Sequence, residues 1–270
     1  MMPAERRDHL IARLAADGKV VAKDVAHDLG LSDDTVRRDL RDLAAAGLCQ
    51  RVYGGALPVS PALADYPTRV TVEPDSKQRV AARGAALIPP GGTVILDGGT
   101  TTLAVVRALP VDFECTVITH SPTVSAALLD HRSIEVFMLG GRLFKHSAVA
   151  SGAAAVEATL GISADVFLLG VTGVHPDEGL TTGDADEAAM KRALAARAAE
   201  TFVLASVEKI GTASRYRVLP LAEVAGVVTD APADNDTIRQ LRRRGVVVLD
   251  AGAGAGRPAR HPDPPPGEPW

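Results

Sequence analysis

The sequence predicts an α/β domain with a mostly parallel sheet over residues 77–250, preceded by a small helical domain over residues 1–57. Two observations predict this division. Residues 4–53 are dense in charge at helical spacing, whereas short apolar runs alternate with helix-like stretches from Lys77 to Asp250. Strands that are apolar almost throughout are typical of parallel sheets that helices cover on both faces.

The predicted strands share a continuous apolar character. They are Val94–Leu96, Thr116–Ile118, Ile134–Leu139, Val166–Leu169, Phe202–Leu204, Val227–Val228 and Val246–Leu249. Prolines within residues 58–76 predict a linker or strap between the domains. Glycine and proline dominate residues 251–270, so we expect a disordered tail there.

Composition narrows the class of protein. The net charge of −4 gives no sign of a nucleic-acid binder, and the two cysteines, Cys49 and Cys115, have no disulfide or metal-site spacing. The chain shows no signal-peptide pattern and no apolar run near the roughly 20 residues that a membrane span requires. We therefore expect a cytoplasmic protein with no metal, no cofactor and no membrane contact.

Helical periodicity divides the N-terminal domain. We expect a first helix over about Ala4–Ala16, with Leu10, Ile11 and Leu14 on its buried face, and a second over about Ala22–Leu29. Lys19–Val21 could form a short strand between them. A third helix is expected over Asp33–Ala46, after the turn at Gly30, with Ser32 as its N-cap and Gly47 ending it.

The third helix has two contrasting faces. At 100° per residue, Val36, Leu40, Leu43 and Gly47 share one arc, and Arg37, Arg38 and Arg41 occupy the opposite arc with Asp34. A helix held in this way is typical of a DNA-recognition helix. Leu48–Tyr53 should begin a β wing that turns at Gly54-Gly55, where Arg51 is suited to a phosphate or the minor groove. A helical bundle with a solvated charged face remains an alternative, since residues 1–57 hold nine basic and nine acidic residues.

The order of these motifs resembles the DeoR family of transcriptional regulators. The stretch from Leu31 to Leu40, then Leu43, Gly47 and Arg51-Val52-Tyr53-Gly54-Gly55-Ala56, follows the family's turn, recognition helix and wing, with Tyr53 where members usually have histidine. The resemblance implies a winged helix-turn-helix that binds double-stranded operator DNA. The expected DNA-contacting residues are Ser32, Asp34, Thr35, Arg37, Arg38, Arg41, Arg51 and Tyr53.

In the C-terminal domain, a candidate phosphate loop follows the first strand: Asp97-Gly98-Gly99-Thr100-Thr101-Thr102. Glycines let backbone N–H groups approach an anion, hydroxyls add donors, and the start of the next helix adds partial positive charge. A tight β-to-α turn with a capping threonine is an equal alternative. The loops Thr119–Ser121, Gly140–Arg142 and Gly170–Gly173 should converge at the same edge of the sheet.

Other polar residues have simpler interpretations. Glu187 and Lys191 lie at i, i+4 on a helix expected over about Asp184–Glu200, which favours a surface ion pair. His120 and His146 show no metal spacing and are expected to be solvated. Lys209, after the Phe202–Leu204 strand, is the better candidate for contact with an anion.

From about Arg69 to Asp250 the chain resembles the DeoR sensor domain, which is similar in fold to ribose-5-phosphate isomerase. The markers are Arg69, Lys77, Asp97–Thr101, Gly140-Gly141, Gly179-Leu180-Thr181, Glu187, Lys209 and Gly211. The resemblance implies a phosphorylated sugar or polyol as effector, held by Gly99, Thr100 and Thr101 at the phosphate. Asp97, Glu187 and Lys209 would then face the sugar, and Gly98, Gly140 and Gly141 are further expected effector-binding residues. The family commonly has an aspartate where this chain has Ser206.

These observations favour an effector-controlled repressor of a carbohydrate-catabolism operon, which we expect to be a homo-oligomer, either a dimer or a tetramer. Two alternatives stay open. One is a sugar-phosphate isomerase with an accessory domain, in which Glu187 would serve as the base. The other is a DNA-binding adaptor without a ligand.

Overall fold

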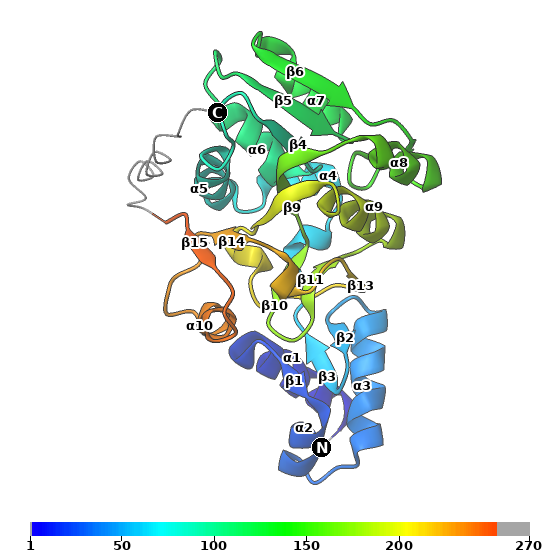
Figure 1. Ribbon diagram of the computed structural model, residues 1–270. Coiled ribbons are helices and arrows are strands. Elements are labelled where there is room, and N and C mark those ends of the chain that lie inside the picture. Colours follow the sequence, from blue (N-terminus) through cyan, green and yellow to red (C-terminus); the bar gives the residue numbers. More distant parts are fainter. Residues whose placement is uncertain (1, 253–270) are drawn as a thin grey trace.

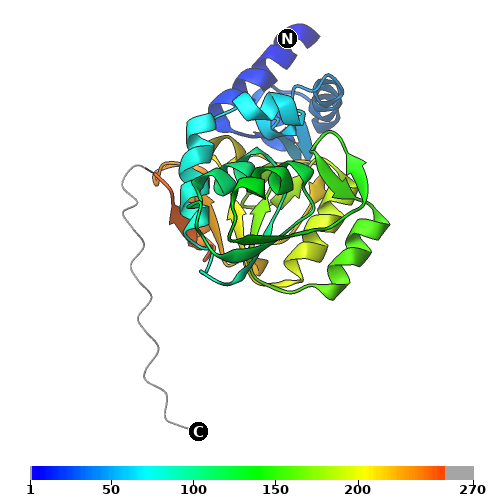
Figure 2. The same ribbon diagram turned by 90° about the horizontal axis from the view of Figure 1, so that it is seen from above.

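The computed structural model describes residues 2–252, which form a small helical domain and a larger α/β domain (Figure 1). The predicted fold class is confirmed. In Figures 1 and 2 the N-terminal domain, in blue, lies against one side of the larger domain. The predicted tail lies, from residue 253 onward, outside the described residues, and Ala251 and Gly252 follow the last strand.

The N-terminal domain has three helices and a three-stranded antiparallel sheet in the order β1-β3-β2. Its elements are α1 (Pro3–Asp17), β1 (Val20–Val21), α2 (Ala22–Asp28), α3 (Asp33–Ala45), β2 (Gln50–Val52) and β3 (Gly55–Leu57). Leu10 and Leu14 of α1 pack with Val36, Leu40 and Leu43 of α3 in one buried cluster. Ile11, which was expected on the same face, is 38% exposed, because the buried face of α1 is narrower than predicted.

Ion pairs join α1 to α3. Asp39 is buried on α3 and binds the Arg6 guanidinium, and Asp42 binds Arg7 at 3.0 Å. These pairs were not predicted, because helical periodicity places Asp39 beside the apolar stripe but does not identify its partner. They occupy two carboxylates of α3 on the side that faces α1.

The segment expected to be a linker is mostly helical. It contains the 3-10 helix η1 (Pro61–Leu63), α4 (Tyr66–Thr71) and the first residues of α5 (Pro74–Ala85). Each of its helices has a proline in the first turn, where a missing N–H costs no hydrogen bond. The prolines therefore mark helix starts, and we call residues 58–73 the strap.

The strap packs against the α/β domain. The buried Ser60 hydroxyl donates to the carbonyl of Thr172, and the backbone N–H of Tyr66 donates to the carbonyl of His146 at 2.9 Å. The segment that joins the two domains is thus fixed to the larger one.

Every predicted apolar run lies in one seven-stranded parallel sheet with the order β15-β14-β12-β9-β4-β5-β6. The strands are β4 (Thr93–Leu96), β5 (Cys115–Thr119), β6 (Ile134–Met138), β9 (Ala164–Gly170), β12 (Ala198–Leu204), β14 (Gly226–Thr229) and β15 (Val248–Asp250). Val94 and Leu96 pack on the face that α5 covers, whereas Ile95 packs on the opposite face. Helices on both faces explain why these strands are apolar throughout.

Helices cover both faces of the sheet. On one face lie α5, α6 (Thr100–Ala108) and α7 (Pro122–Ala127), and on the other lie α8 (Ala153–Ala158), α9 (Ala185–Ala195) and α10 (Asp236–Arg243). The helix predicted over Asp184–Glu200 is shorter than expected, because the chain enters β12 at Ala198. Among residues 2–252, no helix has the length and apolar character needed to cross a membrane.

Smaller elements connect the main ones. They are β7 (Arg142–Phe144), β8 (Val149–Ser151), β10 (Gly173–His175), β11 (Gly179–Thr182), β13 (Tyr216–Arg217), η2 (Leu128–Asp130), η3 (Thr159–Gly161), η4 (Val207–Lys209) and η5 (Leu221–Glu223). The hairpin β7–β8 and the sheet β10-β11-β13 are antiparallel and were not predicted.

The strand order reverses beside β4. The chain runs from β4 to β5 and β6 in one direction, then crosses back to β9 and continues through β12, β14 and β15 in the other. Loops that leave β4 and β9 therefore diverge to opposite sides and leave a crevice at the carboxyl ends of these strands, where open α/β sheets bind ligands.

Phe167, a fully buried residue of the central strand β9, tests this core. Phe167→Ala should lower the free energy of unfolding by about 3–5 kcal/mol, because it leaves a cavity among packed strands and helices. Val111→Ala, at a position 68% exposed, should change it by less than about 0.5 kcal/mol. Denaturant unfolding of both variants measures the difference, and equal stabilities would contradict the described packing.

Candidate functional site

The exposed surface of α3 is basic. Arg37, Arg38 and Arg41 are all exposed, while Val36 and Leu40 are buried beneath them. Ser32 caps the helix by accepting a hydrogen bond from the Thr35 backbone N–H at 3.2 Å. The helix therefore holds its aliphatic stripe inward and its arginines outward.

Acidic partners engage one of these arginines. Arg37 pairs with Asp33, one turn earlier, at 2.9 Å. Arg38 and Arg41 form no ion pair among residues 2–252, and Asp39 and Asp42 are engaged by α1. The domain has equal numbers of acidic and basic residues, but they are unevenly distributed. Two arginines on the outer face of α3 form no ion pair within residues 2–252.

The wing extends this surface. Arg51 of β2 is exposed, and Tyr53 at the β2–β3 turn is 103% exposed. Arg37 and Arg51 line one shallow depression together with Gly54 and Gly55, so the helix and the wing lie side by side. A convex helix flanked by a basic wing has the shape and charge to enter a DNA groove and bind the adjacent phosphates.

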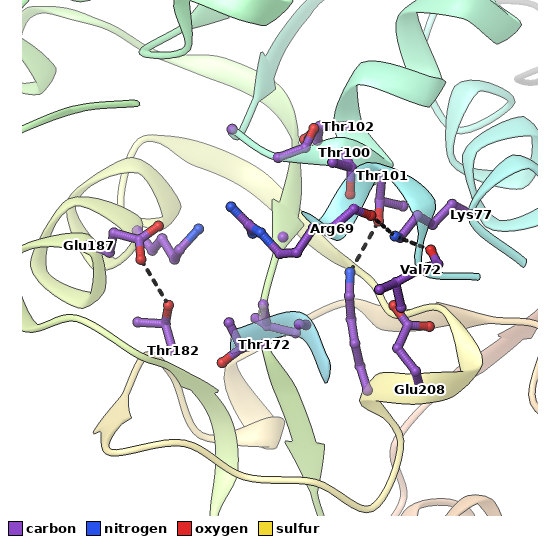
Figure 3. Close-up of a pocket in the computed structure, with 17 residues that line it drawn as sticks. Arg69, Val72, Lys77, Thr100, Thr101, Thr102, Thr172, Thr182, Glu187 and Glu208 are labelled. Carbon is purple, nitrogen blue, oxygen red and sulfur yellow. Dashed lines mark hydrogen bonds between the residues drawn. The ribbon is translucent and has the colours of Figure 1, made fainter. Parts of the chain in front are cut away.

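A second candidate site is a cavity at the crevice beside β4 (Figure 3). Residues from the loops after β4, β9 and β12, from α9 and from the strap line it. They are Ala62, Arg69, Val72, Lys77, Gly98, Gly99, Thr100, Thr101, Thr102, Gly170, Val171, Thr172, Thr182, Glu187, Lys191, Glu208 and Lys209.

The loop after β4 needs its glycines. A Cβ at position 98 would lie 2.0 Å from Cγ1 of Val149, and Gly99 has a φ of +126°, which disfavours other residues. Thr100–Thr102 then form the first turn of α6. The free backbone N–H groups of that turn point along the helix axis toward the cavity end, which favours an anion there.

Asp97 does not face the cavity, contrary to the expectation. It is fully buried, and its carboxylate accepts hydrogen bonds from the backbone N–H groups of Gly98 and Gly170, both at 2.8 Å. The Lys191 ammonium binds it at 2.6 Å. Asp97 therefore joins β4, β9 and α9, and acts by positioning the loops that line the cavity.

The interpretation of Glu187 and Lys191 as a surface ion pair was wrong, because both residues are buried. Lys191 pairs with Asp97, and Glu187 accepts a hydrogen bond from the Thr182 hydroxyl at 3.4 Å. The helix α9 turns this face toward the sheet, so the i, i+4 spacing places both side chains at the cavity and not at the surface.

His120 was expected to be solvated and is buried instead. Its Nε2 lies 3.5 Å from Oδ1 of Asp97. Burial lowers the pKa of His120 to about 4, although Asp97 acts in the opposite direction, so this histidine is neutral at pH 7. His146 is exposed, as expected, on the β7–β8 turn.

Three cations at the cavity are partly or wholly removed from water. Lys209 donates to the Thr101 hydroxyl at 3.1 Å, and burial lowers its pKa to about 8. Burial also lowers the pKa of Arg69 and of Lys77, whose ammonium donates to the carbonyls of Arg69 and Val72. Burial makes the charged form of each group costly, and an anion bound beside them would offset this cost.

Two buried polar atoms at the cavity have no hydrogen-bond partner within the described part of the chain. They are Nε of Arg69 and Oε2 of Glu208. Ser206, at the position where an aspartate was expected, is buried and donates to Oε1 of Glu208 at 2.8 Å. A carboxylate is thus present at this wall, supplied by Glu208 and held by Ser206.

The structure brings most predicted effector residues together, but not all. Gly98, Gly99, Thr100, Thr101, Glu187 and Lys209 line the cavity. Gly140 and Gly141 do not, and a Cβ at Gly141 would lie 2.8 Å from that of Ala155, so this glycine serves the packing of β7–β8 on α8.

The candidate list omitted Lys191 and Glu208, which line the cavity with Arg69 and Lys77 of the marker set. Lys191 could have been found from its position one turn after Glu187, and Glu208 from its place beside Lys209. Among residues 2–252, no group of three or more potential metal ligands gathers in the structure.

The buried pair of Asp97 and Lys191 gives a test of this arrangement. Asp97→Asn should lower the free energy of unfolding by about 3 kcal/mol, because it leaves a buried ammonium without its counter-charge. Adding Lys191→Met should recover part of this loss, and a double-mutant cycle by denaturant unfolding measures the coupling. Strictly additive effects would show that the two groups do not depend on each other.

Two family models match consecutive parts of the chain, in the order of its two domains. The family model described as a DeoR-like helix-turn-helix domain matches residues 6–62, and the DeoR C terminal sensor domain matches residues 72–231. Among solved structures, a ribose 5-phosphate isomerase from Methanocaldococcus jannaschii gives a TM-score of 0.38 at 18% identity, over 50% of this chain and 54% of that chain.

Curated relatives match along nearly the whole chain. The transcriptional regulator GlpR of Haloferax volcanii is 32% identical, over 93% of this chain and 98% of its own length. The repressor GlcR of Bacillus subtilis is 30% identical over 92% and 96%, and the glycerol-3-phosphate regulon repressor of Escherichia coli is 28% identical over 86% and 92%. With both domains matched in order and the recognition helix and sensor cavity in place, this chain belongs to the DeoR family of DNA-binding transcriptional regulators.

Proposed function

We propose that this regulator represses a carbohydrate-catabolism operon and that a phosphorylated sugar or polyol, bound in the cavity beside β4, controls its DNA affinity. The observation that supports this most directly is the pair of unpartnered atoms in one cavity. Arg69 Nε requires an acceptor, and Glu208 Oε2 requires a donor. A molecule with an anionic group and hydroxyl groups satisfies both.

The anionic group is matched by the basic side of the cavity. Arg69, Lys77 and Lys209 all lose hydration on burial, which lowers their pKa values, and a phosphate would restore favourable interactions for each. The start of α6, with Thr100 and Thr101, adds backbone and hydroxyl donors beside Lys209. Phosphate is therefore the anion that fits best.

The hydroxyl groups are matched by two carboxylates, Glu187 on the wall formed by α9 and Glu208 beside Lys77 and Lys209. Glu187 and Glu208 line the cavity from α9 and from the loop after β12. Carboxylates accept hydrogen bonds from hydroxyls and repel a second phosphate, so they favour one phosphorylated end and one polyol end. The printed name of the Escherichia coli relative, a glycerol-3-phosphate regulon repressor, supports this class of ligand.

A regulator fits this site better than an isomerase. A catalytic base needs a carboxylate free to approach the substrate carbon. Glu187 is buried and accepts a hydrogen bond from Thr182, and Lys191 is engaged by Asp97. The relatives are named as regulators or repressors, which supports the same choice.

The strap offers a route from the cavity to the DNA-binding domain. Ala62 and Arg69 of the strap line the cavity, and a second hollow of about 360 Å³ shares both residues with it. Ala44, Gly47, Cys49 and Gln50 of the DNA-binding domain line this second hollow. A ligand that moves Arg69 would therefore shift the end of α3, and unequal binding to the two arrangements would change DNA affinity.

DNA binding by α3 can be tested with Arg38→Ala, on a duplex selected by the wild-type protein from random sequences. Loss of one guanidinium contact should weaken binding about 5- to 150-fold, or about 1–3 kcal/mol, and reduce the slope against salt by about one if the contact is a phosphate. Arg107→Ala removes the same charge from exposed α6 and should have little effect. Equal binding by both folded variants would contradict the orientation of α3.

Ligand binding can be tested by thermal stabilisation with a panel that includes glycerol 3-phosphate and ribose 5-phosphate. Each unphosphorylated parent serves as the control. Because the pKa of Lys209 is lowered to about 8, its charge is present below pH 8 and lost above it, so affinity should fall roughly tenfold between pH 7 and pH 9.

Lys209→Met should bind the same ligand more weakly, lose this pH dependence and keep its DNA affinity. Stabilisation by no phosphorylated compound would favour the adaptor without a ligand. If each unphosphorylated parent raised the melting temperature as much as its phosphorylated form, the ligand would not need a phosphate.

A further inference from the structure

One edge of the seven-stranded sheet is open. Within residues 2–252, β6 pairs with β5 on one side and with no strand on the other. A strand in a parallel pair directs alternate backbone groups to its neighbour and the rest outward. Its outer N–H and C=O groups are therefore a template for another strand.

The side chains of β6 give this edge no protection. Phe137 is 53% exposed and Met138 is 47% exposed, and Val136 is also exposed. Leu143, on the neighbouring β7, adds a further exposed apolar side chain. Edge strands usually carry charges, prolines or bulges that prevent pairing. Glu135 is the one charged residue of β6.

The apolar side chains lie on both faces of the edge. The side chains of Val136 and Met138 lie on the same face of β6 as Ile134, which is buried on the face of the sheet that α7 covers. The side chain of Phe137 lies on the same face as that of Leu139, which is buried on the opposite face of the sheet. An occupant must therefore present a strand that is apolar on both of its faces.

We propose that a second copy of this chain pairs with this edge, so that β6 and its counterpart lie antiparallel across a two-fold axis near Phe137. The two sheets then form one continuous sheet. Phe137 faces its own counterpart on the axis, and Val136 faces Met138 of the partner subunit on the other face.

The charges fit this arrangement. With the axis at Phe137, the two Glu135 side chains lie at opposite ends of the paired segment, about 14 Å apart along the strand direction at 3.4 Å per residue. Like charges are thereby separated, whereas a parallel pairing in register would place them side by side.

The other edge of the sheet is a poorer partner for β6. β15 spans Val248–Asp250, ends in a carboxylate and lies beside α10, whose last turn contains Arg242 and Arg243. Pairing of β6 with β15 of another copy would also be head-to-tail, which forms open chains of molecules unless the rotation closes. The two-fold pairing of β6 with itself closes at once.

The location of β6 leaves the DNA surface free. In Figure 1, β6 lies at the end of the molecule opposite to the domain that contains α3. A pair formed there keeps Arg38 and Arg41 accessible in both copies and places the two DNA-binding domains at its far ends, so that each would contact its own stretch of duplex.

Full-length Phe137→Arg tests the interface by size-exclusion chromatography with light scattering at tens of micromolar. The variant should have half the molar mass of the wild type, because it places two like charges on the axis. Val111→Arg, which replaces another exposed apolar residue, should keep the wild-type mass. Unchanged mass for Phe137→Arg, or a monomeric wild type, would overturn the proposal.

A cross-link provides a second measurement. Both native cysteines, Cys49 and Cys115, are buried, so Phe137→Cys introduces an exposed thiol without a competing one in the described residues. Mild oxidation should convert most of this variant into a covalent dimer, whereas Val111→Cys should remain largely monomeric under denaturing conditions. Equal cross-linking of the two variants would show that the edges do not meet.

Discussion

The architecture of the sensor domain depends on one buried carboxylate. Asp97 binds the backbone of its own loop and of the β9 loop, and holds the Lys191 ammonium of α9 at 2.6 Å. Its carboxylate thus fixes, at a single point, the two loops that diverge where the strand order reverses. Because the glycine and threonine loop continues directly from Asp97, the shape of the cavity follows from this ion pair.

Around that point, the cavity is lined by cations that burial has made costly and by two carboxylates, of which Glu208 lies beside Lys77 and Lys209 and Glu187 comes from α9. Cations removed from water in this way gain stability beside an anion, which is the basis of the proposed ligand class. The strap provides part of the wall and also lines the hollow beside the DNA-binding domain. In the proposed function, this shared packing is what connects ligand binding to DNA affinity.

The sequence was sufficient to predict the sheet, because every buried strand of a parallel sheet must be apolar on both faces. The sequence was also sufficient to predict α3, because the helical spacing of its apolar residues and its capping residues indicate the same helix. Prediction from the sequence was wrong where contacts with the rest of the fold decide whether a segment is helical or a side chain is buried. The prolines of the strap mark helix starts, and the spacing of Glu187 and Lys191 fits a surface pair equally well. Asp97 was placed at the ligand because a motif names residues without showing which way they point.

The contacts of the strap also bear on how such regulators can be divided. The sensor match begins at residue 72, yet Ala62 and Arg69 form part of the cavity and Ser60 is anchored to Thr172. A fragment cut at the family boundary would lack one wall of its own binding site. Exchange of DNA-binding domains between relatives would therefore preserve ligand recognition only if the junction falls before Ser60, where the wing has just ended.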